Sequence, residues 1–91
     1  MLGKKYINKI NLLSKQYQIK KVYLFGSSVA KKNFNDYDLA VSGLAPQKYF
    51  EFYGKLILSL PKPVDLVDLS EVGRFFKKSI ISEGKLIYER H

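Results

Sequence analysis

The residues of this chain that are best suited to chemistry are a glycine-serine pair and three aspartates: Gly26, Ser27, Asp36, Asp38 and Asp65. Asp36 and Asp38 are two positions apart, so in a strand their carboxylates point to one face, about 6 to 7 Å apart along it. Carboxylates this close repel each other by several kcal/mol at an effective dielectric of about 20, and Asp65 adds to that repulsion. A bound cation removes it, and oxygen ligands without histidine or cysteine suit Mg²⁺ or Mn²⁺. Taken alone, the Asp36/Asp38 pair is equally typical of a solvated turn before a strand.

Gly26 and Ser27 follow an apolar run that is typical of a strand, and they indicate a phosphate-binding turn. Glycine at a strand end allows a sharp turn and a close approach of the backbone to a ligand, and serine adds a hydroxyl donor. If Ser27 or Ser28 caps a short helix, the free N–H groups of its first turn face a bound anion. The pattern therefore predicts that Gly26 and Ser27 hold the phosphates of a nucleoside triphosphate. Lys31 and Lys32 either add positive charge to this turn or lie on the solvated surface.

Asp65 and Asp68 compete for the position of the third carboxylate. Both lie in a short apolar run, where alternation puts Asp65 and Val67 on one face and Leu66 and Asp68 on the other. Asp68 ends the run just before Ser70, where a helix-capping role explains it better. Asp65 is therefore the favoured residue for chemistry.

The pattern of apolar residues predicts alternating helices and strands. Apolar residues recur every three or four positions from residue 2 to residue 17, which indicates an amphipathic helix. Pro46 suits the first turn of a helix that Pro61 ends, and Gly84 suits the end of the last helix. The predicted order is helix 2–17, strand 21–25, a short helix that leads to a turn at 33–35, strand 37–42, helix 46–60, strand 64–68, helix 70–83 and strand 85–89. This order predicts an α/β (α+β) fold, a mixed sheet of about four strands flanked by helices, in one domain that covers residues 1–91.

The aromatic residues separate into core and surface candidates. The apolar stripe of helix 46–60 consists of Tyr49, Phe50, Tyr53, Leu56, Ile57 and Leu60. A stripe at helical spacing is much more often core than a platform for stacking bases, so Phe50 is expected in the core. Phe52 lies off the stripe, and Phe75 and Phe76 cannot both face inward on one helix. Phe52 and one of these two are therefore candidates for a partner surface or for ordinary exposed side chains, and Tyr37 is expected to pack under the sheet.

Composition limits the classes of function. The 91 residues carry 16 basic and 8 acidic side chains, a net charge of +8 that attracts polyanions or an acidic partner protein. The lysines are spread along the chain without a recognised nucleic-acid module, so only nonspecific attraction to nucleic acid is expected. The absence of cysteine excludes disulfides and thiolate metal ligands, and His91 at the end of the sequence is given no role. Because the amphipathic start fits neither a secretory signal nor a membrane span, we expect a cytoplasmic location and no membrane partner.

The order of these features resembles the minimal nucleotidyltransferases, the small branch of the DNA polymerase β-like nucleotidyltransferase superfamily. One strand precedes Gly26-Ser27, another follows Asp36 and Asp38, and a third contains Asp65. The resemblance extends over nearly all of the chain. It implies that Asp36 and Asp38 bind two Mg²⁺ ions, and that Asp65 shares one metal and activates the acceptor hydroxyl. It also implies that Gly26 and Ser27 hold the triphosphate.

The same resemblance implies transfer of AMP from ATP to a protein hydroxyl. It further implies an antitoxin that modifies a tyrosine of a HEPN-type toxin, its partner in an oligomer. The family often has an arginine and a second glycine soon after the serine, where this chain has Ser-Val-Ala-Lys-Lys at 28–32. This departure supports an alternative, an antitoxin that masks the toxin by binding it without turnover. An enzyme that modifies a small molecule such as an aminoglycoside, and a basic nucleic-acid binder, are the lower-ranked alternatives.

Overall fold

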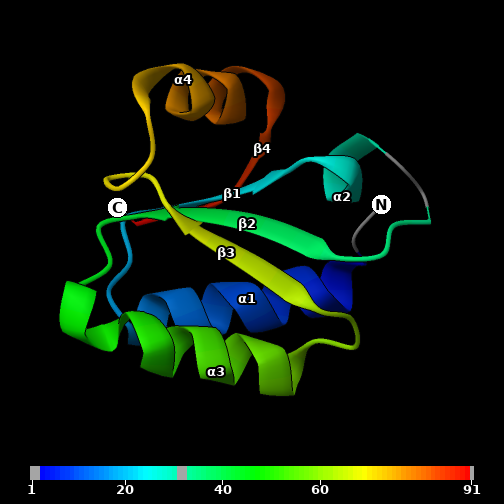
Figure 1. Ribbon diagram of the computed structural model, residues 1–91. Coiled ribbons are helices and arrows are strands. Elements are labelled where there is room, and N and C mark those ends of the chain that lie inside the picture. The colour runs from blue at the N-terminus through cyan, green and yellow to red at the C-terminus, as the bar shows by residue number, and fades with distance from the viewer. Residues whose placement is uncertain (1–2, 31–32, 91) are drawn as a thin grey trace.

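The computed structural model describes residues 3–30 and 33–90 (Figure 1). Its elements are α1 (Lys4–Gln16), β1 (Lys21–Phe25), α2 (Ser27–Ala30), β2 (Tyr37–Ser42), η1 (Pro46–Lys48), α3 (Tyr49–Ser59), β3 (Val64–Asp68), α4 (Arg74–Glu83) and β4 (Lys85–Glu89). The predicted order of elements and the mixed α/β class are confirmed. Lys31, Lys32 and His91 lie outside the described residues. Across the two described ranges, no helix combines the length and the apolar character that crossing a membrane requires.

Four strands form one sheet in the order β3-β2-β1-β4. β1 is antiparallel to β2 and to β4, whereas β2 and β3 are parallel. A parallel pair needs a crossover connection, and η1 and α3 provide it. Figure 1 shows α1 and α3 together on one face of the sheet and α4 on the other, with α2 beyond the end of β1.

The larger core lies between the sheet and the two helices α1 and α3. It includes Ile10, Ile19, Val22, Leu24, Leu39, Val41, Phe52, Leu56 and Leu66. A smaller cluster on the α4 face consists of Tyr23, Ala40, Leu69 and Ile80. Alternation along β2 explains the division, because Tyr37 and Leu39 pack in the larger core while Asp38 between them points to the α4 face. Tyr37 is 2% exposed, so the prediction that it packs under the sheet is confirmed.

The predicted orientation of the helix after β2 is wrong at three positions, one of which is Ile57, expected on the core stripe but 52% exposed. Phe52, expected off the core stripe, is fully buried, and Phe50, expected in the core, is 81% exposed. Hydrogen bonds set the rotation of α3, because the hydroxyls of Tyr49 and Tyr53 donate to backbone carbonyl oxygens of β3 at 2.5 and 2.8 Å. With both tyrosines directed at β3, the core side of the helix contains Phe52 and excludes Phe50. Phe52 is therefore not part of a partner surface.

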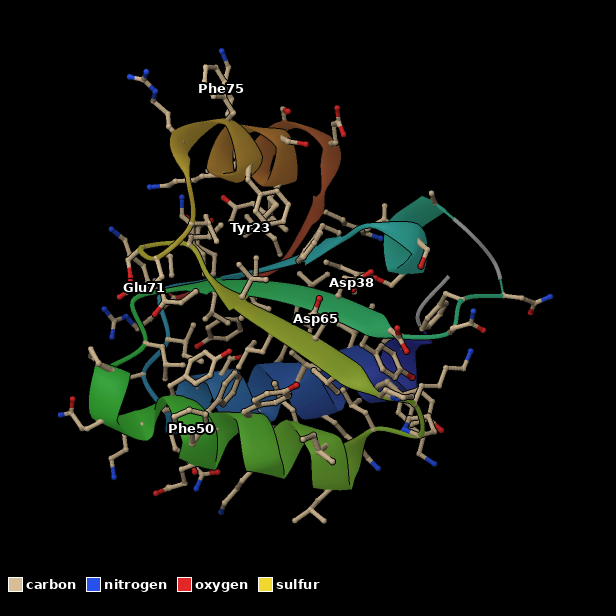
Figure 2. All side chains as sticks on the ribbon, in the orientation of Figure 1. Tyr23, Asp38, Phe50, Asp65, Glu71 and Phe75 are labelled. Atoms are coloured by element: carbon tan, nitrogen blue, oxygen red, sulfur yellow. The ribbon has the colours of Figure 1, made fainter. Side chains whose placement is uncertain are left out.

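The last helix begins later than predicted, at Arg74 instead of residue 70. Asp68 is not the helix cap that we expected, because its Oδ1 accepts the N–H and the hydroxyl of Ser70 at 2.9 and 2.8 Å. This local turn competes with helix formation directly after β3. On α4, Phe75 is 81% exposed and points away from the sheet (Figure 2), and Phe76 is also partly exposed. The expectation that both could not face inward is confirmed.

Candidate active site

Asp38 and Asp65 are brought together by the register of two parallel strands. Asp38 of β2 pairs with Asp65 of β3, and residues paired across strands about 4.8 Å apart direct their side chains to the same face. Figure 2 shows the two carboxylates near each other on the α4 side of the sheet. Asp68 pairs with Val41, whose side chain lies in the larger core, so Asp68 faces the other side. The faces of Asp65 and Asp68 are those that alternation predicts.

The carboxylate of Asp38 lies in an unfavourable electrostatic environment. It is half-buried, and the loss of solvation raises its pKa above the usual 3.8, with the negative charges of Asp65 and Asp36 adding to the rise. Asp65 and Asp36 are exposed to solvent. Asp38 is therefore the least hydrated of the three carboxylates, and repulsion from the other two destabilises its charged form most. Such a group is stabilised either by a proton or by a cation.

Gly26 places the backbone directly against the carboxylate of Asp38. Its φ of +65° lies in the left-handed region, which favours glycine. A Cβ on Gly26 would stand 2.5 Å from Asp38 Oδ2. This proximity follows from the pairing of Phe25 with Asp38, since the chain leaves β1 immediately after that pair and turns into α2. Glycine is therefore required at this position both by the backbone conformation and by the space available.

Ser28 is a positioning residue that the sequence does not distinguish from its neighbour Ser27. It is fully buried, and its hydroxyl donates to Phe25 O at 2.7 Å and accepts the Asp38 N–H at 3.3 Å. One side chain thus connects the end of β1 to the start of β2 and holds the backbone of Asp38 in place. The sequence feature that could indicate this role is the second serine of the Gly-Ser-Ser turn. Its burial, however, cannot be read from the sequence.

Neither serine is the N-cap of α2. The helix begins at Ser27 itself, and the carbonyl oxygen of Gly26 accepts the N–H groups of Val29 and Ala30 at 3.2 and 3.3 Å. Ser27 is therefore the first residue of the helix and Ser28 the second, and Gly26 takes the cap position. The Ser27 side chain is half-exposed to solvent in this first turn, whereas the Ser28 side chain is buried.

The three aspartates are not gathered into one group of ligands. Within residues 3–30 and 33–90, no three histidine, aspartate or glutamate side chains are grouped so that they could hold a metal ion. Asp38 and Asp65 are neighbours across two strands, whereas Asp36 stands exposed in the bend before β2. The structure brings together two of the three predicted ligands and leaves the third at the edge of the site.

A pocket of about 390 Å³ opens beside the turn at Gly26. Most of its wall is apolar and comes from β1, α2 and α4, and it includes Phe25, Val29, Phe76 and Ile80. The rings of Phe25 and Phe76 meet edge to face, with centroids 5.8 Å apart. Because the pocket shares Gly26 with the turn that contacts Asp38, an apolar group carried by a ligand has room next to the aspartates.

Comparison with protein families assigns the chain to a class. Residues 8–91 match the family described as Polymerase beta, Nucleotidyltransferase. The chain therefore belongs to the polymerase β nucleotidyltransferase family, which confirms its resemblance to the minimal nucleotidyltransferases. No curated protein sequence gives a significant match.

Solved structures similar to this one include toxin–antitoxin complexes. A toxin–antitoxin complex with AMP-PNP matches with a TM-score of 0.75 and 28% identity, over 93% of this chain and 74% of that chain. The MntA–HepT toxin–antitoxin complex gives a TM-score of 0.72 and 28% identity, over 93% and 71%. A tri-AMPylated Shewanella oneidensis HEPN toxin in complex with MNT antitoxin gives 0.73 and 29%, over 93% and 71%. These matches agree with the predicted nucleotidyltransferase fold.

Proposed function

We propose that this protein is a Mg²⁺-dependent nucleotidyltransferase that transfers AMP from ATP to a tyrosine hydroxyl of a HEPN-type toxin, and that it is the antitoxin of that toxin. The proposal depends on one observation, the pairing of Asp38 with Asp65 beside the Gly26 turn in a chain of this family. The similar structures support the choice of nucleotide and partner, because one contains AMP-PNP and another contains an AMPylated HEPN toxin.

The residues at the site suit Mg²⁺. Mg²⁺ usually binds through one or two carboxylates, completed by phosphate oxygens and water, and Asp38 and Asp65 supply such carboxylates with exposed Asp36 nearby. Burial and the charges of Asp65 and Asp36 raise the pKa of Asp38, and a nearby cation opposes that rise. Asp38 and Asp65, with Asp36 at the edge of the site, would hold the Mg²⁺ ions, which would neutralise charge at the α-phosphate and at the leaving pyrophosphate.

Gly26 and Ser27 are the residues proposed to hold the triphosphate. Gly26 has no side chain, so phosphate oxygens can approach the backbone next to Asp38. The half-exposed Ser27 hydroxyl can donate a hydrogen bond to one of those oxygens. Ser28 does not contact the nucleotide in this scheme, because its hydroxyl is already engaged in positioning Asp38.

Asp65 is the residue proposed to accept the proton of the tyrosine hydroxyl, because it is the exposed member of the pair. The tyrosine oxygen forms a bond to the α-phosphorus, the bond from that phosphorus to the bridging oxygen of the β-phosphate breaks, and pyrophosphate leaves. α1 and α3 cover the opposite face of the sheet, so the tyrosine approaches from the α4 side (Figure 1). The partner therefore completes the site on that side.

Transfer is tested with ATP labelled in its α-phosphate, Mg²⁺ and the purified partner toxin. We expect label on the toxin with the wild-type protein, and its loss on removal of Mg²⁺ or in Asp38→Asn. Glu89→Gln is the matched control, because it neutralises an exposed carboxylate on β4 whose only described ion pair is with Lys21. Label that persists in Asp38→Asn, or that vanishes equally in Glu89→Gln, would contradict the proposal.

The second candidate is an antitoxin that masks its toxin without turnover. The observation in its favour is the turn after Gly26, where Ser28 is occupied by structural hydrogen bonds and no arginine is present among residues 28–30. A double variant with Asp38→Asn and Asp65→Asn separates the two candidates in cells that produce the toxin. Rescue of growth by the double variant favours masking, and failure of rescue despite a stable complex favours transfer.

A further inference from the structure

A second pocket lies at the opposite end of β3 from the aspartate pair. It measures about 320 Å³ and is lined by Pro46, Tyr49, Phe50, Asp68 and Glu71, from the start of α3 and the turn after β3. In Figure 2 Phe50 and Glu71 mark this region, apart from Asp38 and Asp65. Asp68 is three residues beyond Asp65 along β3, which corresponds to about 10 Å. A ligand in this pocket would therefore leave the candidate active site free.

Two aromatic rings form one wall of this pocket. Tyr49 is half-buried, and its hydroxyl is fixed by donation to the carbonyl oxygen of Leu66. The ring of Phe50 meets it edge to face, with centroids 5.3 Å apart, and is otherwise 81% exposed. Phe52 fills the neighbouring position in the core, so the ring of Phe50 is not needed for the hydrophobic core.

Two carboxylates, those of Asp68 and Glu71, also line this pocket. The Oδ1 atom of Asp68 is held by the N–H and hydroxyl of Ser70, which fixes the carboxylate and leaves Oδ2 for another partner. Glu71 is exposed. Among the described residues the ion pairs are Lys21–Glu89 and Lys48–Glu51, and neither includes Asp68 or Glu71. The net charge of the chain is +8, yet the residues that line this pocket include two carboxylates and, within the described part of the chain, no basic side chain.

We propose that this pocket binds the guanidinium group of an arginine side chain presented by a partner polypeptide. The guanidinium would lie against the ring of Phe50 and pair with the carboxylates of Glu71 and Asp68. Arginine is favoured over lysine because its planar group stacks on aromatic rings and offers several donors to carboxylates at once. A volume of about 320 Å³ is near the lower end of ligand pockets, which span about 300–1,000 Å³, and is suited to one side chain. The proposal does not depend on nucleotidyl transfer.

The test is an NMR titration of the ¹⁵N-labelled protein with a capped peptide that contains one arginine between glycines. We expect shifts confined to the backbone amides of the pocket. The same peptide with citrulline, which keeps the shape and removes the charge, should bind at least several-fold more weakly, as should a lysine peptide. Shifts that are scattered over the surface, or equal affinity for the citrulline peptide, would overturn the proposal. Methylguanidinium that binds as tightly as the arginine peptide would overturn the assignment to a polypeptide.

Matched variants locate the binding site. Phe50→Ala should weaken binding of the arginine peptide about two- to fivefold, as expected for loss of an exposed cation–π contact. Phe75→Ala removes an equally exposed ring on α4 and should leave the affinity unchanged. Glu71→Gln should weaken binding, whereas Glu83→Gln on α4 should not. All four positions are exposed, so the variants should fold, and their amide spectra verify it. Equal effects of Phe50→Ala and Phe75→Ala would refute the assignment.

Discussion

Replacing Gly26 by alanine is expected to destabilise the fold through the site itself. A non-glycine residue in the left-handed region costs about 1–3 kcal/mol, and the φ of Gly26 is +65°. The added methyl group would also stand 2.5 Å from Asp38 Oδ2, so the carboxylate must move. For a domain of this size each kcal/mol lowers Tm by about 4–8 °C, which predicts a decrease of about 5–20 °C in Gly26→Ala. Thermal unfolding followed by circular dichroism measures it.

Gly54→Ala is the matched control for this experiment. Gly54 lies within α3, and an added Cβ there meets nothing within 4 Å. Alanine is favoured over glycine inside a helix by about 0.5–1 kcal/mol, so this variant should be more stable than the wild type. The two glycine substitutions should therefore change Tm in opposite directions. An unchanged or increased Tm in Gly26→Ala would refute the reasoning about the turn.

A double-mutant cycle separates backbone strain from crowding at the site. Asp38→Ala removes the carboxylate that an added Cβ on Gly26 would meet at 2.5 Å and leaves only the Asp38 Cβ, at 3.5 Å. In that background Gly26→Ala should cost less stability than in the wild type, because the left-handed φ alone remains unfavourable. Equal costs in the two backgrounds would show that the carboxylate does not lie against this turn.

Three further predictions concern the core, the hydroxyl under the turn and the charge of the site. Phe52→Ala should lower the free energy of unfolding by about 3–5 kcal/mol in urea denaturation, whereas Phe50→Ala should change it by less than about 0.5 kcal/mol; similar losses would contradict the orientation of α3. Ser28→Ala should cost about 1–3 kcal/mol because it leaves the partly buried Asp38 N–H without its partner, and Ser27→Ala should be nearly neutral for stability. The reverse order would show that the wrong serine is assigned to positioning. Because the pKa of Asp38 is raised in the folded state, its charge costs stability at neutral pH, and this cost disappears as the pH falls through the raised pKa. Asp38→Asn should therefore be more stable than the wild type near about pH 7, with an advantage that shrinks toward about pH 4; an advantage that does not change with pH would contradict the proposed cause.

Periodicity was sufficient to predict the sheet face of the key residues. Alternation along β2 and β3 depends only on the extended backbone, so the sequence correctly places Tyr37 in the core and Asp65 on the face opposite to Asp68. The pairing of Asp38 with Asp65, in contrast, could not be predicted from periodicity. It depends on a parallel register that the η1–α3 crossover sets through tertiary packing, and no local pattern contains it.

The errors have a common physical origin, which is the choice between two alternatives of similar apolar character. Phe50 and Phe52 are equally apolar, and the tyrosine hydroxyls that bond to β3 decide which of them is buried. Ser27 and Ser28 are identical in type, and the enclosure between β1 and β2 decides which one holds Asp38. In both cases hydrogen bonds between elements distant in the sequence make the choice, so the sequence alone leaves it open.

The most direct measurement of the central claim is to compare Asp65→Asn with the wild-type protein in two assays, nucleotide binding by calorimetry and AMP transfer by intact mass spectrometry of the partner toxin. Removal of a metal ligand that also accepts a proton should reduce transfer by at least about 100-fold. The affinity for AMP-PNP with Mg²⁺ and the Tm should remain close to those of the wild type, because Asp65 is exposed and does not hold the phosphates. Transfer at nearly the wild-type rate in Asp65→Asn would contradict the account.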